Sequence, residues 1–200
     1  MSDIPTLYVP RLSPTERLVS LTPIFLRDVR TGAPPRLRTG LRIGLRGATL
    51  CVRFDGRDDG VVATFAARDD PLWKEDVFEV FLAPREPPRL YFEFEVNPLG
   101  TLFDARVESP ELARSSMRVE TAWDCPGFEA RVTRRAGRWS AMLRIPLDSV
   151  SLGSLPARLR ANFCRIDRGL VDEYSAWSPT FADPADFHVP QRFGILKLGS

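Results

Sequence analysis

Hydrophobic positions along this chain recur in short runs that alternate with polar positions, and the clearest run is Tyr91–Val96. In this run the even-numbered positions are apolar and fall on one face of an extended segment, whereas Tyr91, Glu93 and Glu95 fall on the other. A period of two is typical of a β-strand that is buried on one side. We therefore expect a strand with one face in the core and one face in water.

Further short runs are rich in β-branched and aromatic residues and end at turn residues, such as Asp55-Gly56. The chain has 18 prolines and 13 glycines, which leave no room for long helices. The sequence therefore predicts an all-β fold, a single antiparallel β-sandwich of jelly-roll or immunoglobulin-like type. Short helical turns are expected at Pro110–Ser115 and Pro146–Val150. Besides Tyr91–Val96 within Leu90–Val96, the expected strands are Arg42–Leu45, Ala48–Phe54, Val61–Ala66, Val77–Leu82, Leu102–Val107, Phe128–Thr133, Trp139–Ile145, Leu159–Ile166 and Phe193–Leu198.

Length and composition fit one globular domain. The chain has 200 residues, of which 44% are hydrophobic and 27% are charged, and this excludes a disordered, collagenous or coiled-coil protein. We expect residues 1–36 to be a lead-in segment that packs on a domain formed by residues 37–200. The cysteines Cys51, Cys125 and Cys164 are widely spaced and are interpreted as small hydrophobic residues, without a disulfide framework or a zinc site.

The charge pattern argues against nucleic acid and membrane partners. The formal net charge is only +2, and the basic stretch from Arg11 to Arg57 lacks the interleaved aromatic residues of a base-stacking surface, so we interpret it as a solvated sheet face. No run approaches the roughly 18 apolar residues of a membrane span. The first residues do not have the pattern of a signal peptide, and we expect a cytoplasmic protein. The oligomeric state stays open.

Candidate chemistry is sparse. His188 is the one histidine, and no nucleophile elbow accompanies it, so a catalytic triad is not indicated. Glu93 and Glu95 lie two apart on one strand face, which leaves three interpretations open: a solvated face, a glycosidase acid–base pair, and acceptors for sugar hydroxyls. The acidic stretch Asp55–Glu79 lacks EF-hand spacing, so calcium binding stays open as well.

Aromatic residues in polar, turn-rich segments give the most informative signal. Trp73 stands between Asp69-Asp70-Pro71 and Lys74-Glu75-Asp76, and Trp177 and Phe187 have similar surroundings. Flat rings beside carboxylates and arginine suit the apolar faces and hydroxyls of a sugar. Packing that anchors a loop is the alternative for each of these rings.

Three segments in order, Asp69–Leu82, Tyr91–Gly100 and Phe187–Gly194, resemble the family 9 carbohydrate-binding modules and their relatives in the DOMON-like β-sandwich group. The resemblance spans about residues 40–198. It implies a non-catalytic β-sandwich that binds short β-linked glucans, xylan fragments or their component sugars between two aromatic rings. Such modules accompany glycoside hydrolases in polysaccharide breakdown, are normally exported, and often hold structural calcium.

The resemblance also assigns roles to individual residues. It places the two stacking rings on Trp73 and Phe187, and polar contacts on Glu79 and Asn97. Glu95 stands where the family has an arginine. The predicted ligand-binding residues are Trp73, Glu79, Asn97, Arg165, Trp177, Phe187 and His188, with no catalytic residue.

Three alternatives to sugar binding remain open at this point. The first is a protein-interaction scaffold that has lost the sugar site. The second is a glycoside hydrolase-like enzyme that uses Glu93 and Glu95. The third is haem ligation by His188 with Met117 or Met142, as in some DOMON-type relatives.

Overall fold

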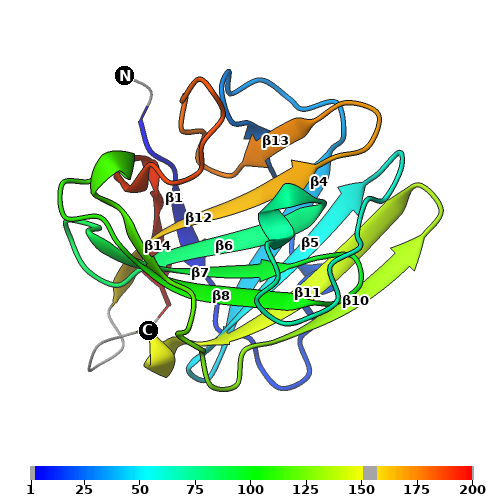
Figure 1. The fold of residues 1–200 in the computed structure, drawn as a ribbon. Coiled ribbons are helices and arrows are strands. Elements are labelled where there is room, and N and C mark those ends of the chain that lie inside the picture. Colours follow the sequence, from blue (N-terminus) through cyan, green and yellow to red (C-terminus); the bar gives the residue numbers. More distant parts are fainter. Residues whose placement is uncertain (1–2, 151–156, 200) are drawn as a thin grey trace.

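The structure is a computed structural model that describes residues 3–150 and 157–199, and its strands form two facing sheets (Figure 1). Nearly all neighbouring strands are antiparallel, while β1 runs parallel to β14. The order in the nine-stranded sheet is β1 (Thr6–Val9), β14 (Gly194–Leu198), β12 (Arg158–Asp167), β6 (Val77–Ala83), β7 (Leu90–Val96), β8 (Leu102–Glu108) and β9 (Arg118–Glu120), while β13 (Glu173–Ala176) joins β12 to β3 (Arg27–Asp28).

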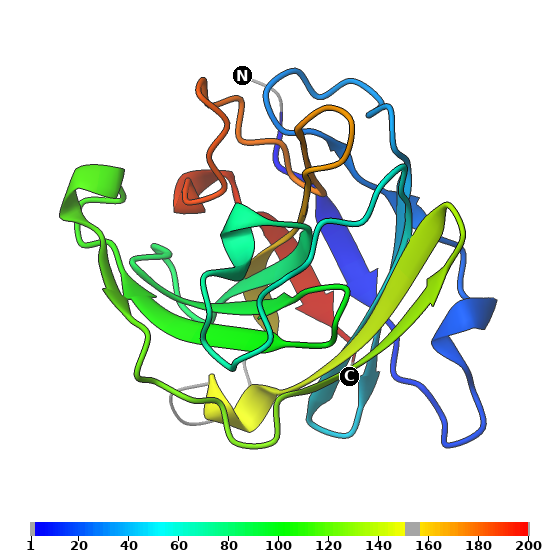
Figure 2. The same cartoon turned by 45° about the vertical axis from the view of Figure 1, so that its right-hand side comes forward.

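The second sheet has five strands in the described part of the chain, and Figure 2 shows it as a separate layer. Its order is β10 (Glu129–Arg135), β11 (Arg138–Pro146), β5 (Thr49–Arg57), β4 (Thr39–Arg46) and β2 (Ile24–Phe25). Single 3₁₀ turns interrupt the loops: η1 (Leu18–Ser20), η2 (Leu72–Lys74), η3 (Arg114–Ser116), η4 (Leu147–Ser149) and η5 (Pro190–Arg192). The predicted antiparallel β-sandwich with short helical turns is therefore confirmed.

The N-terminal segment contributes to both sheets. Strand β1 lies at the edge of the nine-stranded sheet, and Arg11 then forms a bridge with Leu45 of β4 in the other sheet. Further along, β2 pairs with β4, and β3 pairs with β13. The segment thus links the two layers through backbone hydrogen bonds, while the predicted boundary at residue 36 stays a prediction.

Two details of the predicted strands are wrong. The segment Val61–Ala66 has no strand partner, because its backbone N–H groups donate to carboxylates near the following turn. Val62 N–H donates to Asp76 Oδ2 (2.7 Å) and Thr64 N–H to Glu75 Oε2 (2.5 Å). Strand β5 also continues through the expected turn at Asp55-Gly56, since both β4 and β11 pair with these residues.

The main core lies between the two sheets. Its centre is an aromatic stack in which the Phe78 ring lies 4.6 Å from the Phe54 ring and 3.8 Å from the Trp139 ring, measured between centroids. Phe78 comes from β6 of one sheet, and the other two rings come from β5 and β11 of the other sheet. The burial of these large rings is the chief contact that holds the layers together.

A second apolar cluster covers the outer face of the nine-stranded sheet, which the alternation had predicted to be wet. Tyr91 and Glu95 are fully buried there, and Glu93 is only 5% exposed. Loop residues such as Leu72 and Phe187 pack over this face. The prediction of a solvated face is thus wrong, because segments distant in sequence fold over it. The three cysteines are buried, as predicted.

Candidate functional site

A pocket of about 470 Å³ lies on this outer face, among the segments that carry or adjoin η2, η3 and η5. Its aromatic lining consists of Trp73, Phe103, Tyr174 and Phe187. Trp73 is 41% exposed and meets the Phe103 ring edge-on, with a centroid separation of 5.2 Å. Phe187 is buried and packs 6.1 Å from the Tyr174 ring. The pocket therefore presents one open indole and several apolar walls.

The strand register brings carboxylates to the floor of the pocket. Glu79 of β6 stands opposite Glu95 of β7, and Glu93 lies two residues before Glu95 on the same face. Glu79 and Glu93 line the pocket, and Glu95 lies behind them. One oxygen from each of the three carboxylates falls within 4.8 Å of the others.

These carboxylates are short of hydrogen-bond donors. Among the described residues, Glu79 Oε1 is buried without a partner, and the carboxyl group of Glu95 has Glu93 as its one hydrogen-bonding neighbour, which requires a proton between the two carboxyl groups. Burial raises the pKa of each of the three carboxyl groups, and their mutual repulsion raises the pKa of Glu79 and Glu95 further. A buried acceptor without a donor costs stability, so Glu79 is suited to a ligand that brings hydroxyl or amine donors.

His188 forms one wall and is held by its neighbours. Its Nδ1 lies 2.9 Å from the Tyr91 hydroxyl, and its Nε2 lies 3.7 Å from Glu93 Oε1. Met117 also borders the pocket, with its sulfur 3.3 Å from the same hydroxyl. Both ring nitrogens of His188 are thus directed at protein groups, and Met142 packs in a separate cluster with Leu12 and Cys51, which is not an arrangement for haem ligation.

Two arginines at the pocket have acidic partners. Arg114 Nη1 donates to Asp186 Oδ1 (2.8 Å). Arg168 pairs with Asp172, and its Nη1 donates to the Tyr174 hydroxyl (2.6 Å). Both guanidinium groups also act on the floor through their charge, since Arg168 lowers the pKa of Glu79 and Arg114 lowers that of Glu93, against the larger effect of burial.

The structure brings together four of the seven predicted ligand-binding residues. Trp73, Glu79, Phe187 and His188 all line the pocket. The other three lie elsewhere, so the proposed site keeps only these four of them. Whether any of them contacts a sugar stays a prediction.

Asn97, Arg165 and Trp177 have structural surroundings. The Asn97 side chain accepts from the backbone N–H groups of Leu99 and Thr101 (both 3.0 Å) and donates to Phe65 O (2.8 Å), which holds the turn after β7. Trp177 is 7% exposed and belongs to the core between the sheets. Arg165 is 1% exposed and points between the sheets, toward Asp58 and Asp167.

Several lining residues had no signal in the sequence. Phe103 stands opposite Glu95 in the register of β7 and β8, and this pairing could have been found once the strands were aligned. Arg114, Arg168 and Tyr174 come from loops and a short strand whose positions depend on tertiary packing. Strand periodicity carries no information about such segments.

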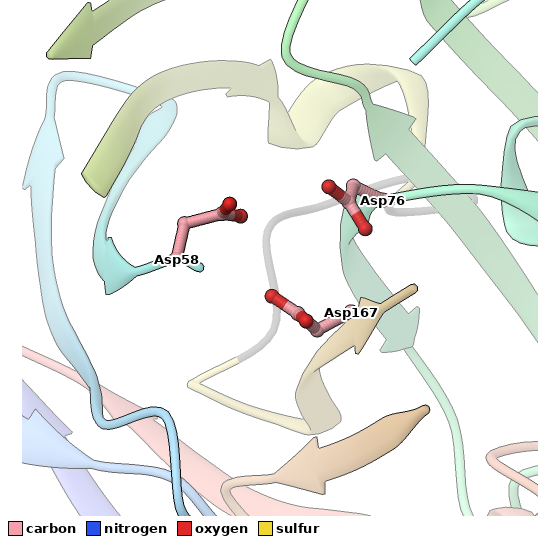
Figure 3. Close-up of side chains that lie close together, drawn as sticks. All are labelled: Asp58, Asp76 and Asp167. Carbon is pink, nitrogen blue, oxygen red and sulfur yellow. The ribbon is translucent and has the colours of Figure 1, made fainter. Parts of the chain in front are cut away.

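The acidic stretch contributes to a second cluster, away from the pocket, in which Asp58, Asp76 and Asp167 point toward one another (Figure 3). Arg165 Nη2 bonds to Asp58 (3.1 Å) and to Asp167, and Asp76 accepts from the backbone N–H groups of Val62 and Arg168. One guanidinium against three carboxylates leaves a formal charge of about −2 in a buried site.

Burial raises the pKa of Asp167 to about 6 and also raises that of Asp76, and the single guanidinium of Arg165 leaves the three carboxylates short of positive charge. Hard carboxylate oxygens with this deficit fit a calcium ion, which these three aspartates would hold. A bound calcium ion would stabilise the fold by holding together the segments around residues 58, 76 and 167. Calcium binding stays a prediction.

A larger cavity, about 790 Å³, is an open groove over the five-stranded sheet. The basic stretch contributes Arg38, Arg42, Arg53 and Arg57 to it. Asp55 pairs with two of these, Arg42 (2.8 Å) and Arg53 (2.6 Å). The exposed ring of the groove, Phe25, is covered by the Arg38 guanidinium at 3.5 Å from the ring centroid, and no carboxylate of this groove is buried without a partner in the described residues. We therefore take the smaller pocket as the candidate site. In the described part of the chain, no helix has the length and apolar character to cross a membrane.

Comparisons with known proteins identify the family. The chain resembles a crystal structure of a protein from Bacteroides uniformis, with 19% identity, a TM-score of 0.80, and coverage of 98% of this chain and 100% of the other. It also resembles a family 9 carbohydrate-binding module from Caldicellulosiruptor kristjanssonii, solved with cellotriose (13% identity, TM-score 0.69, coverage 98% and 94%) and with glucose (14% identity, TM-score 0.68, coverage 98% and 96%).

Sequence comparison extends this result. A curated relative from Arthroderma benhamiae, described as an extracellular protein, is 24% identical over 174 residues, which cover 80% of this chain and 78% of the relative. The sequence profile described as Carbohydrate-binding family 9 matches residues 34–198. This match covers most of the chain, so the protein belongs to carbohydrate-binding family 9.

Proposed function

We propose that this protein is a non-catalytic carbohydrate-binding domain that takes a sugar unit of a short β-linked glucan or xylan-type saccharide into the pocket beside Trp73. Family membership supports this proposal, as do the module structures solved with cellotriose and with glucose. The function would support polysaccharide breakdown by glycoside hydrolases. A cytoplasmic location stays a prediction.

The observation that carries the proposal is the buried, unpartnered Oε1 atom of Glu79 at the floor of a pocket with aromatic walls. A sugar ring has apolar C–H faces that cover an indole, and its hydroxyls donate hydrogen bonds to a carboxylate. A saccharide seated beside Trp73 would thus remove the cost of the unpartnered acceptor on Glu79.

The geometry does not favour the hydrolase alternative. Glu95 is fully buried and does not line the pocket, so it has no access to a glycosidic bond. Glu93 and Glu95 also lie on the same side of any sugar in the pocket, whereas an acid and a nucleophile or base must flank the scissile bond.

The experiment is a calorimetric titration of the protein and of Glu79→Gln with glucose, xylose and cellotriose. Glutamine keeps the shape of the side chain and removes its charge, so we expect affinity to fall about tenfold or more, as for the loss of one charge-assisted hydrogen bond. Glu86→Gln, on an exposed turn outside the pocket, is the matched control. Absence of binding to every sugar would overturn the proposal and favour the scaffold alternative.

A further inference from the structure

The floor of the pocket holds more ionisable carboxyl groups than a neutral sugar requires. Glu79 is 2% exposed and Glu93 is 5% exposed, and both line the pocket, with the fully buried Glu95 directly behind them. A hydroxyl acceptor needs one carboxylate, yet one oxygen from each of the three lies within a span of 4.8 Å. This concentration of acceptors suits a ligand that carries positive charge.

The cations around the pocket stabilise the ionised carboxylates only in part, because burial raises the pKa of Glu79 and Glu93 more than Arg168, Arg114 and His188 lower it. Arg114 is paired with Asp186, and Arg168 is paired with Asp172. His188 Nε2 lies 3.7 Å from Glu93, where a protonated imidazole would offset one carboxylate at most. In the described part of the chain, Glu79 Oε1 still has no hydrogen-bond donor.

We propose that the pocket selects saccharides with a free amino group, such as glucosamine and its β-linked oligomers, over the corresponding neutral sugars. This inference rests on the proposed function, because it names the substrate class of the same pocket. A sugar ammonium offers three N–H donors to Glu79 and Glu93, and its charge interacts favourably with all three carboxylates. Trp73 and Phe103 supply ring surfaces beside it, which also attract cations.

The dimensions of the pocket favour an organic cation over a bare metal ion. About 470 Å³ is space for a sugar ring and its substituents, far more than one metal ion fills, and the rings of Trp73, Phe103 and Phe187 make much of the lining apolar. The cavity around Glu79 therefore matches a ligand with a large apolar body and a small charged group.

The test compares glucosamine, glucose and N-acetylglucosamine by calorimetry at neutral pH. We expect glucosamine to bind about tenfold or more tightly than glucose, because it gains a charged hydrogen bond, and N-acetylglucosamine to lose this advantage because its nitrogen is uncharged. Equal affinities for glucosamine and glucose would overturn the inference and leave the proposed function standing. Absence of binding to all three sugars would overturn both.

A second measurement separates charge from shape. Glu95→Gln removes a carboxyl group that can ionise beside a bound ammonium, without changing the lining of the pocket, so we expect the preference for glucosamine over glucose to fall several-fold in this variant. Glu86→Gln removes an exposed charge elsewhere and should keep the ratio of the two affinities. A ratio that is the same in Glu95→Gln as in the unmodified protein would contradict the inference.

Proton exchange gives an independent readout. The carboxyl groups retain protons when they are buried without a cation, so an incoming ammonium should displace protons that a neutral sugar leaves in place. Calorimetry in two buffers of different ionisation enthalpy should therefore report proton release for glucosamine and none for glucose. Identical proton exchange for both sugars would contradict the proposed selection for saccharides with a free amino group.

Discussion

Replacing Trp73 by alanine should weaken saccharide binding by about 10- to 70-fold. The residue is 41% exposed, and a tryptophan side chain offers about 150–250 Å² of contact surface, so about 60–100 Å² is free to be covered by a ligand. At about 25 cal/mol per Å², this area corresponds to about 1.5–2.5 kcal/mol of binding free energy. A loss of about 1.5–2.5 kcal/mol raises the dissociation constant by about 10- to 70-fold.

The assay is calorimetric titration with cellotriose, together with thermal unfolding to show that the variant is folded. The indole packs edge-on against Phe103, so we expect a loss of about 2 kcal/mol in unfolding free energy, about half of what a fully buried tryptophan costs. Phe25→Ala is the control, because Phe25 is 36% exposed on the other sheet and does not line the pocket. An unchanged affinity for cellotriose in folded Trp73→Ala would refute the reasoning.

Three further predictions concern stability. Burial raises the folded-state pKa of Glu95 above the ordinary 4.5, so the folded state binds more protons and stability falls as pH rises above that value. The melting midpoint of Glu95→Gln should therefore match that of the unmodified protein at pH 5 and exceed it at pH 8. An equal loss of stability in the variant at both pH values would contradict this. Calcium should raise the unfolding midpoint and EDTA should lower it, and both effects should be larger above pH 6 than below it. The midpoint of Asp167→Asn should respond to neither. A midpoint of the unmodified protein that does not change with calcium would contradict the predicted metal site. Gly194→Ala would place a methyl group in steric conflict with the Trp177 ring and should cost about 1–3 kcal/mol in denaturant unfolding, while Gly60→Ala, with open space around it, should be nearly neutral. Equal effects of the two substitutions would contradict the packing described.

The sequence contains most of the information about the sandwich. Alternation and turn residues identify strands such as Val77–Ala83 and Leu90–Val96 because the pleat places successive side chains on opposite faces. Alternation cannot show what covers each face. The carboxylates of Glu93 and Glu95 therefore looked solvated, whereas loops from distant parts of the chain bury them.

The candidate site was predictable only in part. Trp73 and Phe187 stood out because each ring lies in a polar, turn-rich segment, and both line the pocket. Trp177 had the same kind of neighbours, yet it packs between the sheets, since the chain after β13 turns inward there. Local composition gives the exposure of a loop, and tertiary packing decides which loops meet.

The most direct test of saccharide binding at this pocket is a titration with cellotriose followed through the four tryptophan indole N–H signals in a nitrogen-15 correlation spectrum. Trp73 is the half-exposed one at the pocket, while Trp139 and Trp177 lie in the core between the sheets. We predict that the Trp73 signal shifts progressively to saturation and that the signals of the two core tryptophans stay in place. A Trp73 signal that does not move while cellotriose binds, or a spectrum unchanged by every saccharide, would contradict the proposed site.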